Sequence, residues 1–421
     1  MRSWQRLAGV VATFVVVAGT VAAEAQQLRD RDRTLEASRQ IADDLRRARM
    51  HYGPFYLLSS IQLADIGYDQ EFFVPVADTS SGFRFGLAAP TRLYLTPNRK
   101  AYFSVGATPQ WSHFGGTRGH NQTGYKTRAD AQFLLNHLYL DAYAARDNEL
   151  RADTGELSSL LTRKNKEVGV NGELKYSSRT SLTYYALTRT QAFPLEANKF
   201  QPDFPVELLD RSEHAYRLAL VHKTFPLTSL FVAAEYAGYS FPNAVFKNSH
   251  RKYGGAGLLY ESGRTTSRLE AGYSRLDFIR TNEKDFKGAV GNFGIQRRIT
   301  DRWGVSAGVA RDLTFSIFRD NNYYITDRAS ISTQYGLTRR VALTGGWTVT
   351  ESRYEIPTAG SKLNTVARRR DRMSFPSIGW TYSSPNHFAG GFDVGYLERT
   401  SNFPITEADG IRLILHLSLN L

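Results

Sequence analysis

The chain has 421 residues, with 34 Gly, 14 Pro, no Cys and an aromatic content of 13%. The absence of Cys excludes thiolate metal sites and a disulfide framework. The formal net charge of +13 is spread along the chain, and because no nucleic-acid recognition motif accompanies it, we expect no nucleic-acid partner.

The N-terminus has the three parts of a secretory signal peptide. Arg2 and Arg6 supply positive charge, residues 7–21 form an apolar core, and Ala23-Glu24-Ala25 is a small-residue cleavage site. We therefore expect residues 1–25 to be removed by cleavage after Ala25. An uncleaved anchor is the alternative, but the core is short for a spanning helix.

Residues 26–52 are charged and rich in helix-forming residues. Leu35, Ile41 and Leu45 recur at helical spacing and form a thin apolar stripe. This pattern predicts a short periplasmic helix or tail. In the simpler interpretation this segment is a solvated leader to the first strand. In the functional interpretation it is a docking segment or a plug.

From residue 53 onward, long segments alternate between apolar and polar residues. The final segment is the clearest, because one register is apolar without a gap: Ile411, Leu413, Leu415, Leu417, Leu419 and Leu421. A period of two places one face on lipid and the other on water. Spanning strands need about 9–11 residues, whereas strands of soluble proteins average about five or six. Residues 53–421 are therefore predicted to form a transmembrane antiparallel up-and-down β-barrel.

Short turns and long connections alternate along the barrel segment, as in outer-membrane barrels. Ser177-Ser178-Arg179 and Thr338-Arg339 are examples of short turns. A further tight turn is predicted at Asn136-His137. Without it, the short turn at Ser177-Ser178 would fall on the side of the long connections. The pattern predicts about eighteen strands, with sixteen as the alternative, and places both termini in the periplasm. Pro90 and Pro376 lie inside proposed strands and predict bulges or shifted strand boundaries.

No hydrolase, metalloprotease, phosphate-loop or dinucleotide motif is present. We therefore assign no catalytic residue, metal site or cofactor, and do not expect an enzyme. On the predicted registers several charged residues face the lumen: Arg84, Arg92, Glu167, Glu173, Arg217, Arg268, Glu270, Arg328, Asp393 and Arg412. Their excess of arginine favours passage of anions or acidic saccharides. Pairing of opposite charges across the wall, which leaves a nearly neutral pore, is the alternative.

A basic run lies at the outer end of a predicted strand and comprises Arg368, Arg369, Arg370 and Arg372. Guanidinium groups pair well with phosphate, so this run predicts contact with lipopolysaccharide. A solvated strand end is the alternative.

The start of the barrel segment carries sharper motifs. Residues 52–57 read Tyr-Gly-Pro-Phe-Tyr-Leu, residues 66–72 read Ile-Gly-Tyr-Asp-Gln-Glu-Phe, and residues 92–97 read Arg-Leu-Tyr-Leu-Thr-Pro. The later turn at Ser178-Arg179-Thr180 is of a similar kind. These segments resemble the outer-membrane β-barrel porins associated with exopolysaccharide loci. The last residue, Leu421, departs from the Phe that such barrels use as part of their signal to the barrel assembly machinery.

The resemblance implies an outer-membrane pore of a Gram-negative cell that exports a secreted or surface polysaccharide, together with a periplasmic polysaccharide export protein. A general or anion-preferring diffusion porin is the first alternative. A structural or receptor barrel with a plugged lumen is the second.

Overall fold

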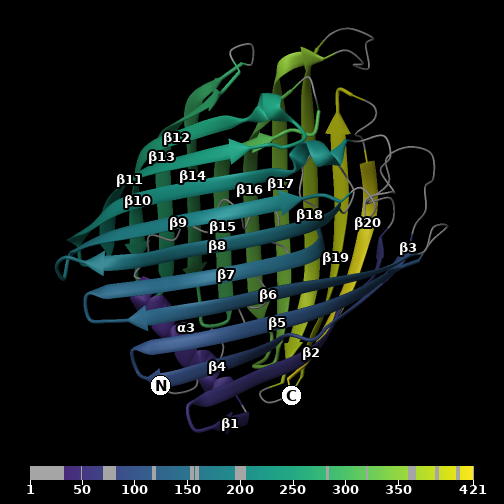
Figure 1. Ribbon diagram of the computed structural model, residues 1–421. Coiled ribbons are helices and arrows are strands. Elements are labelled where there is room, and N and C mark those ends of the chain that lie inside the picture. The colour runs from purple at the N-terminus through teal and green to yellow at the C-terminus, as the bar shows by residue number, and fades with distance from the viewer. Residues whose placement is uncertain are drawn as a thin grey trace.

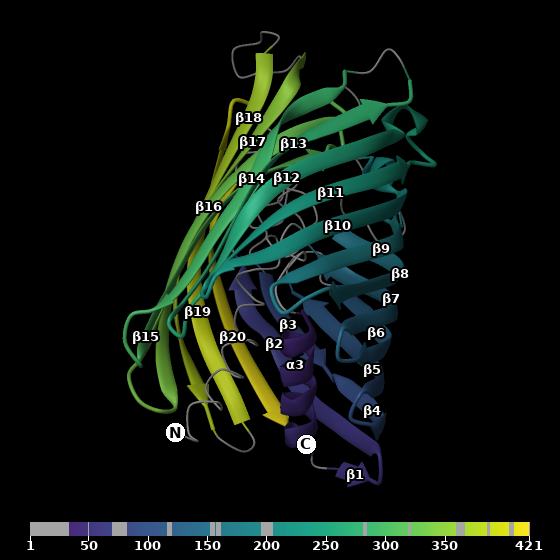
Figure 2. The same cartoon turned by 90° about the vertical axis from the view of Figure 1, so that its left-hand side faces the viewer.

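A computed structural model describes residues 33–48, 50–69, 82–115, 120–151, 156, 161–194, 205–280, 284–318, 321–358, 367–384, 388–403 and 408–420. The predicted signal peptide and Leu421 lie outside this part of the chain. The described residues form an antiparallel sheet that closes on itself as a barrel, with α3 inside it (Figures 1 and 2).

The helical elements are α3 (Arg33–Arg47) and two short 3-10 turns, η2 (Val206–Leu209) and η3 (Val245–Lys247). The first half of the sheet comprises β1 (Met50–Tyr52), β2 (Phe55–Asp69), β3 (Gly82–Ala88), β4 (Thr91–Asn98), β5 (Ala101–Phe114), β6 (His120–Leu134), β7 (Leu138–Arg151), β8 (Leu161–Lys175), β9 (Thr180–Ala192) and β10 (Arg211–Phe225). The second half comprises β11 (Thr228–Ser240), β12 (Ser249–Glu261), β13 (Thr265–Phe278), β14 (Phe286–Arg298), β15 (Trp303–Phe315), β16 (Tyr323–Gly336), β17 (Val341–Thr358), β18 (Ala367–Ser383), β19 (Phe388–Ser401) and β20 (Ala408–Asn420).

Closure of the barrel joins the first long strand to the last. From β5 to β20 each strand pairs with its successor, and β20 pairs back with β2 through contacts such as Ile61↔Leu419. Where neighbouring strands are paired, the ladder satisfies the backbone polar groups in a region without water. The predicted all-β antiparallel barrel with a short helix is confirmed in its coarse form.

The predicted number of strands is corrected. The sheet holds 20 strand segments among the described residues, where the sequence predicted about eighteen. One extra segment is β1, a short hairpin arm on β2, reached through Gly53 at φ 57°. The other arises because β3 and β4 share one place in the wall: both pair with β2 and with β5.

Proline explains the division of that wall position. Ala89 and Pro90 separate β3 from β4, as expected of a residue that has no N–H for the ladder. Pro376, in contrast, stays inside β18, but the pairing of β18 with β19 is interrupted at Phe375 and Pro376. The tight turn predicted at Asn136-His137 is confirmed, because β6 ends at Leu134 and β7 begins at Leu138.

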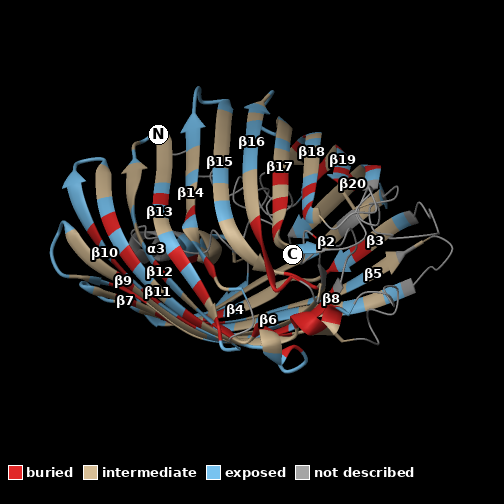
Figure 3. Cartoon of the chain, turned by 90° about the horizontal axis from the view of Figure 1, so that it is seen from above, coloured by how far each residue is buried: buried red, intermediate tan, exposed pale blue. Residues whose placement is uncertain are grey.

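Exposure alternates along the strands, as Figure 3 shows. On the outer face large apolar side chains are solvent-accessible, among them Val168 at 63% and Ile378 at 65%. On the inner face polar and charged side chains are buried, among them Thr183 and Glu270. This is the inverse of a soluble fold, because the surface presented outward is apolar.

Candidate functional site: the barrel lumen

Helix α3 occupies the end of the lumen near the short turns. It lies beside β2, β7 and β8, inside the ring of strands (Figures 2 and 3). Ile41 is buried, and the Asp44 carboxylate accepts a hydrogen bond of 2.5 Å from the Tyr94 hydroxyl. Arg92 Nη1 lies 4.0 Å from the same carboxylate. The predicted helix is thus docked against the inner wall, in place of a solvated leader.

A polar cluster surrounds Asp130 beside this helix. Its carboxylate accepts hydrogen bonds from Arg92 Nη2 at 3.1 Å, Arg128 Nε at 2.6 Å and Ser104 Oγ at 3.1 Å. The Arg128 guanidinium also lies 4.2 Å from the centroid of the Tyr143 ring. Asp130 is buried, and a buried carboxylate is tolerated when it is surrounded by donors in this way.

The next cluster along the wall is centred on Glu167. Its two oxygens accept from the Tyr143 hydroxyl at 2.6 Å and from Arg189 Nε at 2.7 Å. Arg189 also approaches Glu213 at 3.9 Å. The charged groups here are held in fixed positions by one another, which pre-organises the wall for a polar solute.

Glu270 is the centre of a third cluster, which adjoins the second, because its partner Arg217 lies on β10 together with Glu213. It accepts from Arg217 Nη2 at 2.7 Å, from the Tyr253 hydroxyl at 2.7 Å, and from Arg268. Arg217 also lies 3.5 Å from Glu235. Arg217 and Glu270 are both buried, so this network is screened little by solvent.

The Glu156 side chain lies at the end of the lumen where the long connections are. It lies between β7 and β8, yet its side chain reaches the segment between β15 and β16 on the far side of the barrel. The carboxylate accepts from Ser316 Oγ at 2.5 Å and from the Ile317 backbone N–H at 2.6 Å. Glu156 is 1% exposed. Glu156 is therefore held against the opposite side of the barrel mouth.

Asp371 organises the neighbouring wall of the mouth. Arg369 Nη2 donates to it at 2.6 Å, Arg399 Nη2 at 2.8 Å and Ser401 Oγ at 2.6 Å. Arg399 also donates to the Glu156 backbone carbonyl at 2.9 Å. The predicted lipopolysaccharide contact through Arg369 is wrong, because this side chain is buried on the inner face, whereas Arg368, Arg370 and Arg372 are exposed.

Burial shifts the pKa of two ionisable groups at the mouth. The pKa of the Glu156 carboxyl is raised by burial. Burial also lowers the pKa of Lys247, in η3, to about 8, opposed by the nearby Glu156 charge. The Lys247 ammonium donates to the Ser316 carbonyl at 2.5 Å. Segments from three different connections thus meet in one buried polar cluster.

Apolar packing surrounds the polar cluster at the mouth. One group joins Phe193 to η2 and to Ile317, and a second joins η2 to Phe241 and Ala244. Phe315 touches both groups, with its ring 4.8 Å from that of Phe241. These apolar side chains pack the segments that meet at the mouth against one another.

The structure places the predicted lumen residues on the inner face, opposite the exposed apolar side chains of the same strands. Arg217, Arg268 and Glu270 are brought together in one network. Asp393 lies 3.6 Å from His416 Nδ1. In these contacts opposite charges pair across the wall, as the alternative of a nearly neutral pore assumes. The net charge of the lumen stays a prediction.

Sequence reasoning missed several members of the site. Asp130, Arg189, Glu235 and Asp371 follow the same alternation as the predicted residues and were accessible to that argument. Their partners were not, because a pair such as Arg92 and Asp130 joins strands whose relative register only the fold sets. Glu156 lies in a connection that shows no periodic pattern.

The comparisons identify the fold. No protein-family model matches the chain, and no curated protein matches it. Among solved structures, a BenF-like porin from Pseudomonas fluorescens Pf-5 superposes with a TM-score of 0.50 at 11% identity, over 87% of this chain and 99% of that one. OpdK from Pseudomonas aeruginosa, crystallised with vanillate, gives 0.49 at 11% identity over 87% and 98%. OccK3 (OpdO) from the same organism gives 0.47 at 14% identity over 87% and 96%. The likeness to the BenF-like porin shows that this chain shares the β-barrel fold of that porin.

Proposed function

We propose that this protein is an outer-membrane porin that passes small hydrophilic solutes through a narrow, polar lumen. The observation that carries the proposal is the two-faced wall. Its outer face exposes side chains such as Leu218, Val232 and Ile378, while its inner face holds the charged networks of Glu167 and Glu270. Such a wall is stable in hydrocarbon and wet inside.

The position of the wall in the membrane follows from its connections. Short turns such as those at 135–137, 226–227 and 262–264 lie at one end, where α3 also lies. In bacterial barrels this end faces the periplasm and the longer connections face outward. We therefore place α3 on the periplasmic side, and Glu156 and Lys247 at the external mouth.

The contents of the lumen favour small solutes over a polymer. Helix α3 is fixed to the inner wall through Asp44 and Tyr94, and Glu156 is fixed to Ser316 at the mouth. A polysaccharide chain would need both to move. The comparisons lend no support to the polysaccharide-export hypothesis, and the periplasmic export protein expected as a partner remains a prediction from the resemblance alone.

A liposome-swelling series tests the proposed function. Purified protein is reconstituted into liposomes, and swelling is followed with neutral sugars of increasing size and with small anionic and cationic solutes of matched size. We expect swelling with small solutes of either charge and a sharp loss with oligosaccharides. Equal rates for mono- and oligosaccharides, or no swelling at all, would contradict the proposal.

A further inference from the structure

The barrel wall divides between β14 and β15. Their ladder runs from Arg298↔Gly304 to Gly291↔Arg311 and goes no further. Beyond it, among the described residues, neither 286–290 of β14 nor 312–315 of β15 pairs with the other strand, although β14 still pairs with β13 and β15 with β16. The wall therefore has a seam in the half nearer the long connections.

The seam forms because β15 and β16 pass on the lumen side of β14. Phe286 and Val290 lie on the inner side of β14, and they pack against Tyr323 and Ile325 of β16. The Phe286 and Tyr323 ring centroids are 5.8 Å apart. All four side chains are buried. This packing seals the seam on the lumen side, so the seam is no side entrance to the pore.

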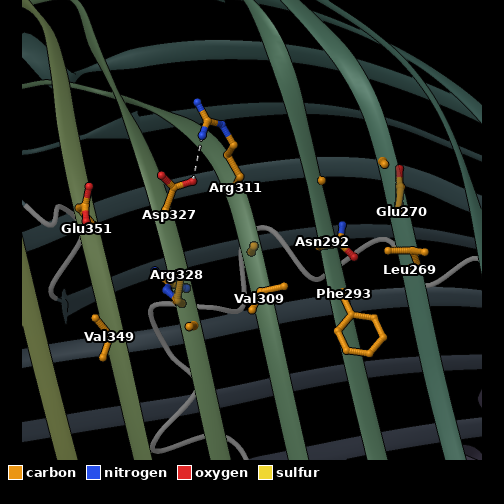
Figure 4. Close-up of a pocket in the computed structure, with 14 residues that line it drawn as sticks. Leu269, Glu270, Asn292, Phe293, Val309, Arg311, Asp327, Arg328, Val349 and Glu351 are labelled. Carbon is orange, nitrogen blue, oxygen red and sulfur yellow. Dashed lines mark hydrogen bonds and ion pairs between the residues drawn. The ribbon is translucent and has the colours of Figure 1, made fainter.

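A groove of about 530 Å³ lies at the foot of the seam, on the strands β13 to β17 (Figure 4). This volume is in the range of about 300–1,000 Å³ typical of small-molecule sites. Small residues form its floor: Ala271, Gly291 and Ala329. A Cβ at Gly291 would lie 2.6 Å from the Glu270 carbonyl oxygen, so the backbones approach closely here and the floor stays low.

The lower walls of the groove are apolar and belong to the outer face. They are formed by Leu269, Phe293, Val309 and Val349. Leu269 is 47% and Val309 is 52% exposed. On a membrane-facing surface these side chains contact acyl chains, so this part of the groove suits hydrocarbon.

The end of the groove nearer the long connections is charged. Arg311, Asp327 and Glu351 line it in Figure 4. Arg311 Nη1 lies 3.5 Å from Asp327 Oδ1, and Arg353 and Arg370 pair with Asp327 and Glu351. Arginines and carboxylates are therefore paired in this rim.

The other lip of the seam is also charged. Lys287 of β14 is exposed and lies opposite Arg275 of β13 in the ladder. Arg275 pairs with Asp277. Cationic side chains therefore flank the seam on both sides, with hydrocarbon-compatible walls below them.

We propose that the seam binds one membrane lipid of the outer leaflet, namely a phosphorylated glycolipid of the lipid A type. An acyl chain would lie between Leu269, Phe293 and Val309, and phosphate would be held by Arg311 on one lip and Lys287 on the other. Guanidinium and ammonium groups on both lips match a headgroup that carries more than one phosphate. The inference rests on the placement of the barrel in an outer membrane and is independent of what the pore conducts.

Native mass spectrometry tests the site directly. Protein extracted in detergent is stripped of lipid, titrated with bisphosphorylated lipid A, and measured beside the variants Arg311→Gln, Ala329→Trp and Ala144→Trp. Ala329→Trp fills the groove, whereas Ala144 is an exposed outward alanine on β7, far from the seam. Heat-modifiable mobility on gels confirms that each variant is folded.

We expect one lipid A molecule to be retained by the wild-type protein and by Ala144→Trp. Arg311→Gln should weaken retention roughly fivefold, since a basic residue near an anionic headgroup contributes about 1 kcal/mol, and Ala329→Trp should abolish it. Equal retention by all four proteins would overturn the proposal. Equal competition by phosphatidylglycerol, which has one phosphate, would overturn the assignment of the glycolipid.

Discussion

Replacing Glu156 by Ala should release the connection between β7 and β8 from the barrel mouth. The substitution removes both acceptors of the Ser316 hydroxyl and the Ile317 N–H, which donate at 2.5 and 2.6 Å. It also takes the nearby negative charge from buried Lys247. Removing one partner of a buried, hydrogen-bonded charged pair destabilises the folded arrangement by about 3–5 kcal/mol. At about 3 kcal/mol the undocked population rises roughly a hundredfold, since each 1.4 kcal/mol is about tenfold.

Two assays read out this release. Limited proteolysis of the connection should accelerate in proportion to the undocked population, and single-channel recordings should show higher mean conductance. Glu156→Gln keeps an acceptor oxygen and should lie between wild type and Glu156→Ala. Glu398→Ala, which removes an exposed carboxylate from the outer end of β19, is the matched control. Unchanged proteolysis and unchanged conductance in Glu156→Ala would refute the anchoring role.

Three further predictions concern stability and assembly. Arg217→Met should destabilise the barrel by about 3 kcal/mol in urea titration, because it leaves buried Glu270 with fewer partners; an unchanged midpoint would count against the network. Gly257→Ala should impair assembly, because its Cβ would lie 2.3 Å from a backbone oxygen, whereas Gly254→Ala meets nothing within 4 Å; equal yields of heat-modifiable protein would contradict this. Burial lowers the pKa of Lys247 to about 8, below the ordinary value of about 10.4, so the mouth should become more stable as pH rises between these values. Lys247→Met should remove that rise in protease protection, and an identical pH profile in the variant would contradict it.

The barrel was predictable because its signal is local and periodic. The alternation at 411–421 assigns lipid and lumen faces without knowledge of any partner strand, and the turn at Asn136-His137 follows from the rhythm of connections. The extra strand segments were not predictable in the same way. Pro90 was recognised as incompatible with a continuous ladder, but whether it would produce a bulge or a break depended on how β2 and β5 pair around it.

The organisation of the lumen was only partly accessible. Alternation placed Arg217 and Glu270 on the inner face, but their contact joins strands that are not neighbours, so it depends on side-chain reach across the curved wall. Arg369 shows the opposite failure. It belongs to a basic run that suggests an exposed surface. The alternation of the strand nevertheless turns its side chain inward onto Asp371, whereas Arg370 and Arg372 point outward. Applying the period of two inside the run would have separated them.

The most direct test of a lumen narrowed from within is the conductance of the barrel with and without α3. Wild-type protein and a variant lacking residues 33–47 are reconstituted in planar bilayers under identical salt. We predict small single-channel currents for the wild type and several-fold larger ones for the deletion, with larger neutral sugars now able to enter, because Asp44 no longer fixes a helix to Tyr94. Equal conductance and equal sugar exclusion in the two proteins would contradict a helix that limits the pore.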